Sequence, residues 1–245
     1  DGQYGIEQRY QDVLAGRPRV VEAQSDAAGH EVFGTESVVD QGAPGADLQL
    51  TIDSGLQAAL EQELFAAWVA DKAKSVSAVV MDPYTGEVYA EATYPSYDGN
   101  AYQKTAANHP ERFTDPVIAQ VYEPGSVFKM LTAAAALGKG VVSPTTRVKD
   151  SSVLLVDGGR ITNADRKGKG WIEFQDGIAY SRNIVAAKVA MKLGSTTKEA
   201  SAELYRTWTR FGFGRPTGID LAGEVGGLLK DPSLNPWREI DLANG

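Results

Sequence analysis

The sequence contains no cysteine and only two histidines, His30 and His109. Without cysteine there can be neither a thiol nucleophile nor a disulfide. A Ser-His-Asp triad would have to use one of these two histidines, and neither lies in a recognisable catalytic motif. Two isolated histidines do not form a zinc-binding pattern either, so we expect no metal site and no cofactor. Serine-based catalysis in this chain would need another base, and lysine is the first candidate.

Long apolar runs and positive charge are also scarce. No stretch approaches the roughly 18 apolar residues that a membrane-spanning helix needs. The formal net charge of −8 argues against binding to nucleic acid or anionic membranes through bulk charge. The 245 residues are 42% hydrophobic and 23% charged, which suits a globular chain of one large domain or two small ones. The chain starts at Asp1 without a signal-peptide pattern, so we expect an excised segment.

One stretch, residues 122–129, carries the clearest chemical signal. Proline and glycine interrupt regular structure just before Ser126, which we expect to be the N-cap of an alanine-rich helix. Lys129 follows three residues later, so the two side chains should share one helix face. A hydroxyl with an amine one turn later is the arrangement of a Ser/Lys nucleophile–base pair. The N–H groups at the helix start would also favour negative charge developing near Ser126.

The Ser-x-x-Lys pattern alone is weak, because it also occurs at Ser195–Lys198. That second match follows Gly194, and Thr196 and Glu199 have the spacing of a capping box. We interpret Ser195 as structural. For Ser126, an ordinary helix cap remains an open alternative at this point.

Hydrophobic periodicity predicts short strands mixed with helices. Asp53 or Ser54 should cap the first long helix, and a Pro/Gly turn at 82–86 should join two strands in a hairpin. Trp68, Trp171 and Trp208 are expected in the core. We expect helices at about 55–70, 183–193 and 197–210, and strands at about 48–52, 75–81 and 87–92.

A second motif, Ser181-Arg182-Asn183, stands at the start of a predicted helix, 52 residues after Lys129. It too is weak alone, since Ser181 and Asn183 could simply cap the helix. We expect Arg182 to be solvated or ion-paired at the surface. The combination of the two motifs, each opening a helix, is more specific than either one.

The combined motifs resemble those of class B penicillin-binding proteins, the peptidoglycan transpeptidases of the bacterial cell wall. Segments 81–87, 122–129 and 211–224 are also similar to that family. The resemblance implies an α+β, serine β-lactamase-like fold, with an antiparallel sheet flanked by helices. It implies that residues 1–46 are the end of a pedestal or dimerisation-like region, and that residues 47–245 begin the transpeptidase domain.

The resemblance also implies an acyl transfer through a serine acyl-enzyme, with D-Ala-D-Ala stem peptides as substrates and β-lactams as inhibitors. Ser126 would be the nucleophile, Lys129 the base, Ser181 a proton relay and Asn183 a substrate-binding residue. The family's third motif, Lys-Thr-Gly, does not occur in this sequence. We therefore expect a piece of a longer protein with an incomplete sheet, and leave open whether this chain is active by itself.

The motifs do not decide whether an amine or water accepts the acyl group. A D,D-carboxypeptidase or β-lactamase-type hydrolase stays an alternative, as does a non-catalytic β-lactam sensor. The resemblance further implies a role in cell division or cell shape, and other cell-wall synthesis proteins as partners. It implies a location outside the bacterial cytoplasmic membrane, with an anchoring helix that is not in this sequence.

Overall fold

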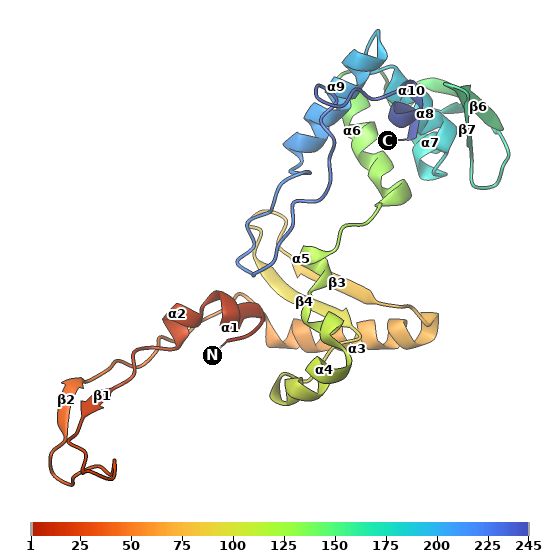
Figure 1. The fold of residues 1–245 in the computed structure, drawn as a ribbon. Coiled ribbons are helices and arrows are strands. Elements are labelled where there is room, and N and C mark those ends of the chain that lie inside the picture. Colours follow the sequence, from red (N-terminus) through yellow and green to blue (C-terminus); the bar gives the residue numbers. More distant parts are fainter. Residues whose placement is uncertain (1, 245) are drawn as a thin grey trace. The chain divides into compact units, whose positions relative to one another are not determined.

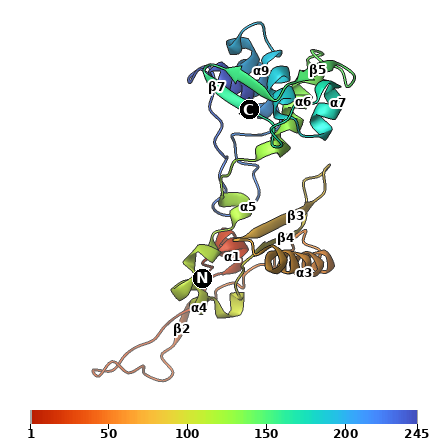
Figure 2. The same ribbon diagram turned by 90° about the vertical axis from the view of Figure 1, so that its right-hand side faces the viewer.

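The computed structural model describes residues 2–244, which form two compact units. The first unit comprises the chain up to Gln120 together with Gly218–Val225. The second comprises Val121–Thr217 and the chain from Gly226 onward. Each unit combines helices with antiparallel strand pairs, as expected for an α+β protein (Figures 1 and 2).

The first unit is built on one long helix and one hairpin. Helix α3 (Ser54–Asp71) is capped by Asp53, whose Oδ1 accepts a hydrogen bond of 2.8 Å from the Leu56 N–H. Strands β3 (Val76–Met81) and β4 (Val88–Tyr94) pair antiparallel. The predicted helix, its cap and the predicted hairpin are confirmed.

A glutamine side chain fastens α3 to the hairpin. Gln57 of α3 donates to the Glu91 carbonyl at 2.8 Å and accepts from the Glu91 N–H at 2.9 Å. The side chain thus replaces the hydrogen bonds that another strand would give to this backbone position.

The predicted strand at 48–52 is wrong. This segment runs beside β4 in irregular conformation: the Thr51 hydroxyl donates to the Val88 carbonyl at 2.6 Å, and the Asp53 N–H donates to the Tyr89 carbonyl at 2.9 Å. This segment of alternating apolar residues is therefore held beside β4 by a side-chain and a backbone hydrogen bond, and not by the regular ladder of backbone hydrogen bonds that a strand forms. The rest of the first unit consists of short elements: α1 (Gly5–Arg9), α2 (Gln11–Leu14), β1 (Val20–Glu22), β2 (Ser37–Asp40), η1 (Gly99–Ala101), α4 (Tyr102–Asn108), η2 (Pro110–Phe113) and α5 (Pro116–Ala119).

The second unit is a helical cluster with two small strand pairs. Strands β5 and β8 pair antiparallel, as do β6 and β7. The helices are η3 (Gly125–Phe128), α6 (Lys129–Gly138), α7 (Phe174–Ala179), α8 (Asn183–Met191), α9 (Thr197–Arg210) and α10 (Glu239–Asn244), and the strands are β5 (Arg147–Asp150), β6 (Val153–Val156), β7 (Gly159–Thr162) and β8 (Gly170–Glu173).

Helix α8 lies in the centre of the second unit's core. Ile184, Val185 and Val189 have no exposed surface, and α6, α7, α9 and α10 contact this helix. Such full burial suits a helix that is apolar on all sides. The predicted helices at 183–193 and 197–210 are confirmed, the first ending slightly earlier, at Met191.

The three tryptophans that the sequence predicts in the core differ in their surroundings. Trp208 is 5% exposed and belongs to the core, as predicted. Trp68 is half-buried beside Phe65 and Tyr94. The prediction for Trp171 is wrong, because this side chain is 59% exposed on the short strand β8.

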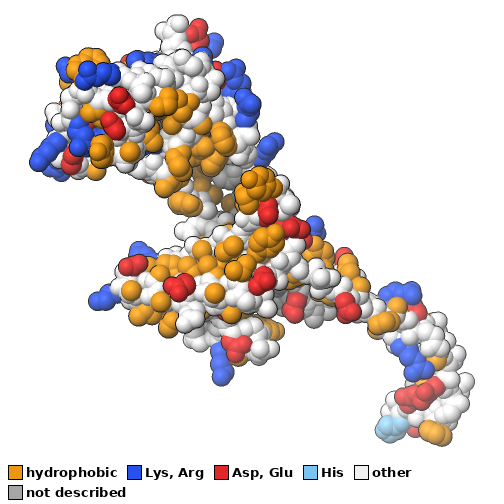
Figure 3. Space-filling model, turned by 180° about the vertical axis from the view of Figure 1, so that it is seen from behind, with side chains coloured by type: hydrophobic (Ala, Val, Ile, Leu, Met, Phe, Trp, Pro, Cys, Tyr) orange, Lys and Arg blue, Asp and Glu red, His pale blue; other side chains and the backbone are white. Residues whose placement is uncertain are grey.

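Hydrophobic side chains also gather on the surface of each unit (Figure 3). Examples are Phe65 and Val69 on α3, and Phe211 and Phe213 just after α9. Within residues 2–244, no helix combines the length and apolar character that crossing a membrane requires.

Candidate active site

The segment that carries Ser126 begins with a reversal of the chain. Gly125 has φ +63°, a left-handed conformation that glycine adopts without steric cost. A 3-10 turn over Gly125–Phe128 then leads directly into α6. The prediction of Ser126 as an N-cap is wrong: Ser126 lies inside the 3-10 turn, and its side chain makes no capping hydrogen bond. Its hydroxyl is exposed and available for other contacts.

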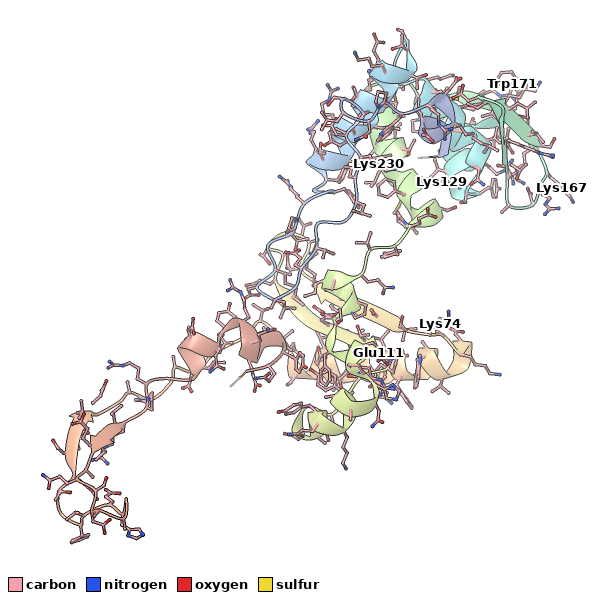
Figure 4. All side chains as sticks on the ribbon, viewed as in Figure 1. Lys74, Glu111, Lys129, Lys167, Trp171 and Lys230 are labelled. Carbon is pink, nitrogen blue, oxygen red and sulfur yellow. The ribbon has the colours of Figure 1, made fainter. Side chains whose placement is uncertain are left out.

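Lys129, the first residue of α6, connects the two sequence motifs (Figure 4). Its Nζ lies 3.0 Å from Ser126 Oγ and 2.9 Å from Ser181 Oγ. It also lies 2.9 Å from the Ser181 carbonyl oxygen and 2.5 Å from Asn183 Oδ1. A lysine ammonium has three hydrogens, so four oxygen neighbours cannot each receive a hydrogen of their own. The structure thus brings all four predicted site residues together around one amine.

The turn between α7 and α8 supplies the second motif. Ser181 is exposed and has φ +52°, which is uncommon for a residue other than glycine. Asn183 is the first residue of α8, and its Nδ2 donates to the Thr162 carbonyl at 2.8 Å. The capping interpretation of this motif is wrong, because Arg182 occupies the N-cap position and makes no side-chain cap.

Arg182 is not at the surface as predicted; it is 5% exposed. Its Nε donates to Asp150 Oδ2 at 2.8 Å, and a terminal nitrogen donates to Asp165 Oδ2 at 2.9 Å. The other terminal nitrogen donates to the Lys167 carbonyl. These partners lie 15 to 32 residues away in the sequence, so no local pattern around the motif could have indicated the burial.

Electrostatics in this site make the charged form of the Lys129 amine less favourable than in water. Burial lowers the pKa of Lys129, and the positive charge of Arg182 lowers it further. A neutral lysine can accept a proton, whereas a lysine ammonium can only donate. The site therefore combines a hydroxyl, an amine within hydrogen-bond distance, and a second hydroxyl that contacts the same amine. This is the geometry of an activated serine nucleophile.

The competing Ser-x-x-Lys match has a different role. Thr196 Oγ1 accepts from the Glu199 N–H at 3.2 Å, and Glu199 Oε2 accepts from the Ser195 N–H at 2.8 Å. The Thr196 bond caps α9, and the Glu199 side chain bonds the N–H of the residue before the cap, which confirms the structural interpretation of Ser195. Among the described residues, no group of three or more His, Cys, Asp and Glu side chains could hold a metal ion.

Comparisons with known proteins agree with this geometry. The family model described as penicillin-binding protein transpeptidase domain matches residues 76–244. Peptidoglycan D,D-transpeptidase FtsI of Escherichia coli K12 is 32% identical over 239 residues, which cover 98% of this chain and 38% of that protein. Stage V sporulation protein D of Bacillus subtilis is 32% identical, over 93% of this chain and 34% of its own length.

Solved structures give the same result for the fold. Penicillin-binding protein 2X of Streptococcus thermophilus superposes with a TM-score of 0.83 at 24% identity, over 100% of this chain and 35% of its own. The transpeptidase domain of Burkholderia pseudomallei penicillin-binding protein 3 has a TM-score of 0.65 at 30% identity, over 82% of this chain and 53% of its own. This confirms the predicted penicillin-binding α+β fold.

The chain spans between a third and two fifths of the length of these curated relatives. The family match nevertheless covers well over half of the chain, including both motifs. The resemblance predicted from those motifs is therefore confirmed, and the chain belongs to the penicillin-binding protein transpeptidase family.

Proposed function

We propose that this protein is a peptidoglycan D,D-transpeptidase that works through an acyl-enzyme on Ser126. The observation that carries the proposal is the position of Lys129 Nζ, 3.0 Å from Ser126 Oγ and 2.9 Å from Ser181 Oγ. Both distances lie within the range that proton transfer by a general base requires. The names of the curated relatives, D,D-transpeptidases among them, support the same activity.

In the first step, neutral Lys129 accepts the proton of Ser126 Oγ, and this oxygen attacks the carbonyl carbon between the last two D-alanines. The Ser126 N–H stabilises the negative charge that develops on the carbonyl oxygen. When the C–N bond breaks, the leaving amine takes a proton from the Lys129 ammonium through the Ser181 hydroxyl. An ester between Ser126 and the stem peptide remains.

In the second step, the amine of a neighbouring stem peptide attacks the ester carbonyl. The proton of this amine passes back through Lys129 to Ser126 Oγ, which leaves as the free hydroxyl. The result is a cross-link and an unchanged enzyme. Asn183 orients the substrate backbone, a role supported by its amide oxygen, which lies 2.5 Å from Lys129 Nζ.

The first test is intact mass spectrometry of the protein with and without excess penicillin. We expect one covalently bound drug per protein molecule, no binding to a Ser126→Ala variant, and normal binding to a Ser195→Ala control. Absence of a drug adduct on the folded wild-type protein expressed from its complete gene would contradict the proposed nucleophile.

The second test distinguishes transfer from hydrolysis. The protein is incubated with a D-Ala-D-Ala stem peptide and an excess of an amine acceptor, and products are separated by mass. A transpeptidase gives the amine adduct, whereas a carboxypeptidase gives only the shortened acid. A penicillin sensor would form a long-lived penicilloyl adduct and leave the stem peptide uncleaved.

The location and partners follow from this chemistry. Because peptidoglycan is assembled outside the cytoplasmic membrane, we propose that the site acts on that side, with other cell-wall synthesis proteins as partners. The anchoring helix and the domain boundary near residue 46 remain predictions. Membrane fractionation of cells that express the complete gene tests the first, and limited proteolysis tests the second.

A further inference from the structure

Ser181 has a strained backbone conformation, which other groups in the structure must stabilise. For a residue other than glycine, a left-handed φ such as its +52° is unfavourable and persists only where neighbouring groups fix it. The two backbone bonds of this turn, from Ser181 N–H to the Ile178 carbonyl and from Arg182 N–H to the Gly177 carbonyl, close it on the side of α7. The opposite side is fixed by side chains.

The Arg182 guanidinium is the centre of that fixation. Its three nitrogens each donate to a different acceptor: Asp150, Asp165 and the Lys167 carbonyl. The Arg182–Asp150 pair is almost fully buried, with 5% and 0% of the two side chains exposed. Arginine's planar fork suits such a site, because it presents several donors in one rigid geometry.

The acceptors of Arg182 are themselves held in place. Asp150 Oδ1 accepts from Asn163 Nδ2 at 2.8 Å, and Asp150 Oδ2 accepts from the Lys169 N–H at 3.0 Å. Asn163, which is 2% exposed, also accepts from the Ile184 N–H at 3.3 Å, in the first turn of α8. The network therefore contacts the chain between Ser181 and Asn183, through Arg182, and directly after Asn183, through the Ile184 N–H.

We propose that Arg182 is a positioning residue for acyl transfer: its buried guanidinium fixes the turn that presents Ser181 and Asn183 to Lys129, and keeps a positive charge beside that lysine. The inference rests on the proposed function, because it assigns Arg182 a role at the same site. Two separate effects follow, one on geometry and one on charge.

The charge effect concerns the proton affinity of Lys129. The acidic groups that face Arg182 are Asp150 on β5 and Asp165 in the loop between β7 and β8, and they contact Arg182 directly. Lys129 instead faces the neutral oxygens of Ser126, Ser181 and Asn183. Arg182 therefore acts on Lys129 as a like charge, and its removal should raise the pKa of Lys129.

The experiment compares Arg182→Met, Arg182→Lys and the control Arg147→Met in the protein expressed from its complete gene. Arg147 is exposed on β5, the strand that carries Asp150, and donates to the Trp171 carbonyl at 3.0 Å. The measured quantity is the rate constant of acylation by a fluorescent penicillin between pH 5.5 and 10, normalised to the titre of reactive sites.

Arg182→Met should lower the acylation rate constant by about 30-fold or more and move the midpoint of its rise to higher pH, by roughly half a unit or more. Arg182→Lys keeps the positive charge but loses the planar guanidinium with its several donors. Its acylation rate constant should therefore fall about tenfold, while the midpoint of the pH-dependent rise stays unchanged. Arg147→Met should match the wild type. Simple loss of folded protein would lower the titre of reactive sites without moving the midpoint.

Two results would overturn the proposal: an Arg182→Met protein with the rate constant and midpoint of the wild type, or, if that variant does not fold, wild-type acylation by Arg182→Lys. If the wild type itself is not acylated, the proposed function fails and the positioning role is judged by amide hydrogen exchange of residues 177–186. Faster exchange there in Arg182→Lys than in Arg147→Met would support the role, and equal exchange would reject it.

Discussion

The proposed chemistry depends on Lys129, because its single amine contacts the hydroxyls of both Ser126 and Ser181. Its lowered pKa means that the folded protein releases this proton at lower pH than the unfolded chain does. Between the two pKa values the unfolded chain binds more protons, so this residue's contribution to stability rises with pH. Function and stability therefore change in the same direction as pH increases through this range.

A Lys129→Met variant should be acylated by penicillin about 10²–10⁴ times more slowly than the wild type, because the base is lost. The rise of the acylation rate with pH should disappear as well. Stopped-flow fluorescence across a pH series measures both effects. The matched control is Lys139→Met, at the other end of the same helix. A Lys129→Met protein that retained the pH-dependent rise would show that another group is the base.

A second titratable group, Glu91 in the first unit, behaves in the opposite way. Burial, together with the neighbouring Asp115 carboxyl, raises the pKa of Glu91 to about 8. The folded state then binds more protons than the unfolded chain between about pH 4.5 and 8. Its contribution to stability is present below the unfolded pKa and is lost as pH rises through the folded pKa.

We therefore expect the first unit to lose about 1 kcal/mol of unfolding free energy between pH 5 and 8, after allowance for the half-exposed position of the carboxyl. Glu91→Gln should remove most of this slope. Urea unfolding at several pH values, followed by the NMR amide signals of the first unit, measures it. Glu87→Gln, on the turn of the same hairpin, serves as the control, and an equal loss of slope there would refute the assignment.

At the scale of elements, the two Ser-x-x-Lys matches differ in how the helix at each of them begins. At α9, Thr196 Oγ1 accepts from the Glu199 N–H, and Glu199 Oε2 accepts from the Ser195 N–H. At Ser126, a 3-10 turn comes before the helix and leaves the serine hydroxyl to Lys129. The same sequence pattern thus has two outcomes, depending on whether its side chains bond to the backbone or to each other.

Thr196→Ala should destabilise α9 by about 1 kcal/mol, the usual cost of losing an N-cap side chain. Ser195→Ala should have little effect, because the Ser195 contact with Glu199 uses a backbone N–H that alanine retains. Denaturant unfolding of both variants gives the comparison. Equal destabilisation by the two substitutions would contradict the capping arrangement.

Elements specified by nearby residues could be predicted from the sequence. The Asp53 cap, the hairpin turn at Asp82 and the capping box of α9 are all local signals, and each was placed correctly. The strand predicted at 48–52 failed because a strand needs a partner ladder, which alternating residues cannot provide by themselves.

The same distinction explains the candidate site. The sequence placed Ser126 and Lys129 one turn apart, and the motif at Ser181 could be recognised, but their contacts across 52 residues depend on the packing of α6 against α8. The burial of Arg182 depends on acceptors contributed by β5 and the loop before β8. Such long-range contacts produce no recognisable pattern in the sequence next to Arg182 or the other site residues.

At the scale of the whole molecule, the four site residues all belong to the second unit. Lys129 and Asn183 begin α6 and α8, and both helices contribute buried residues to the same core cluster. The packing of that core thus sets the separation of the two motifs. A core substitution and a site substitution should nevertheless be distinguishable by what they change.

Leu204 offers the test, because it has no exposed surface and lies in the core cluster on α9, outside both motifs. Leu204→Ala should cost about 2–5 kcal/mol of unfolding free energy, from lost burial and the cavity left behind. The titre of penicillin-reactive sites should then fall at a lower temperature than in the wild type. The acylation rate constant of molecules that remain folded should stay within about twofold, in contrast to Lys129→Met. A large fall in that rate constant at low temperature, with the full titre retained, would contradict this prediction. It would mean that the packing of Leu204 itself sets the geometry of the site.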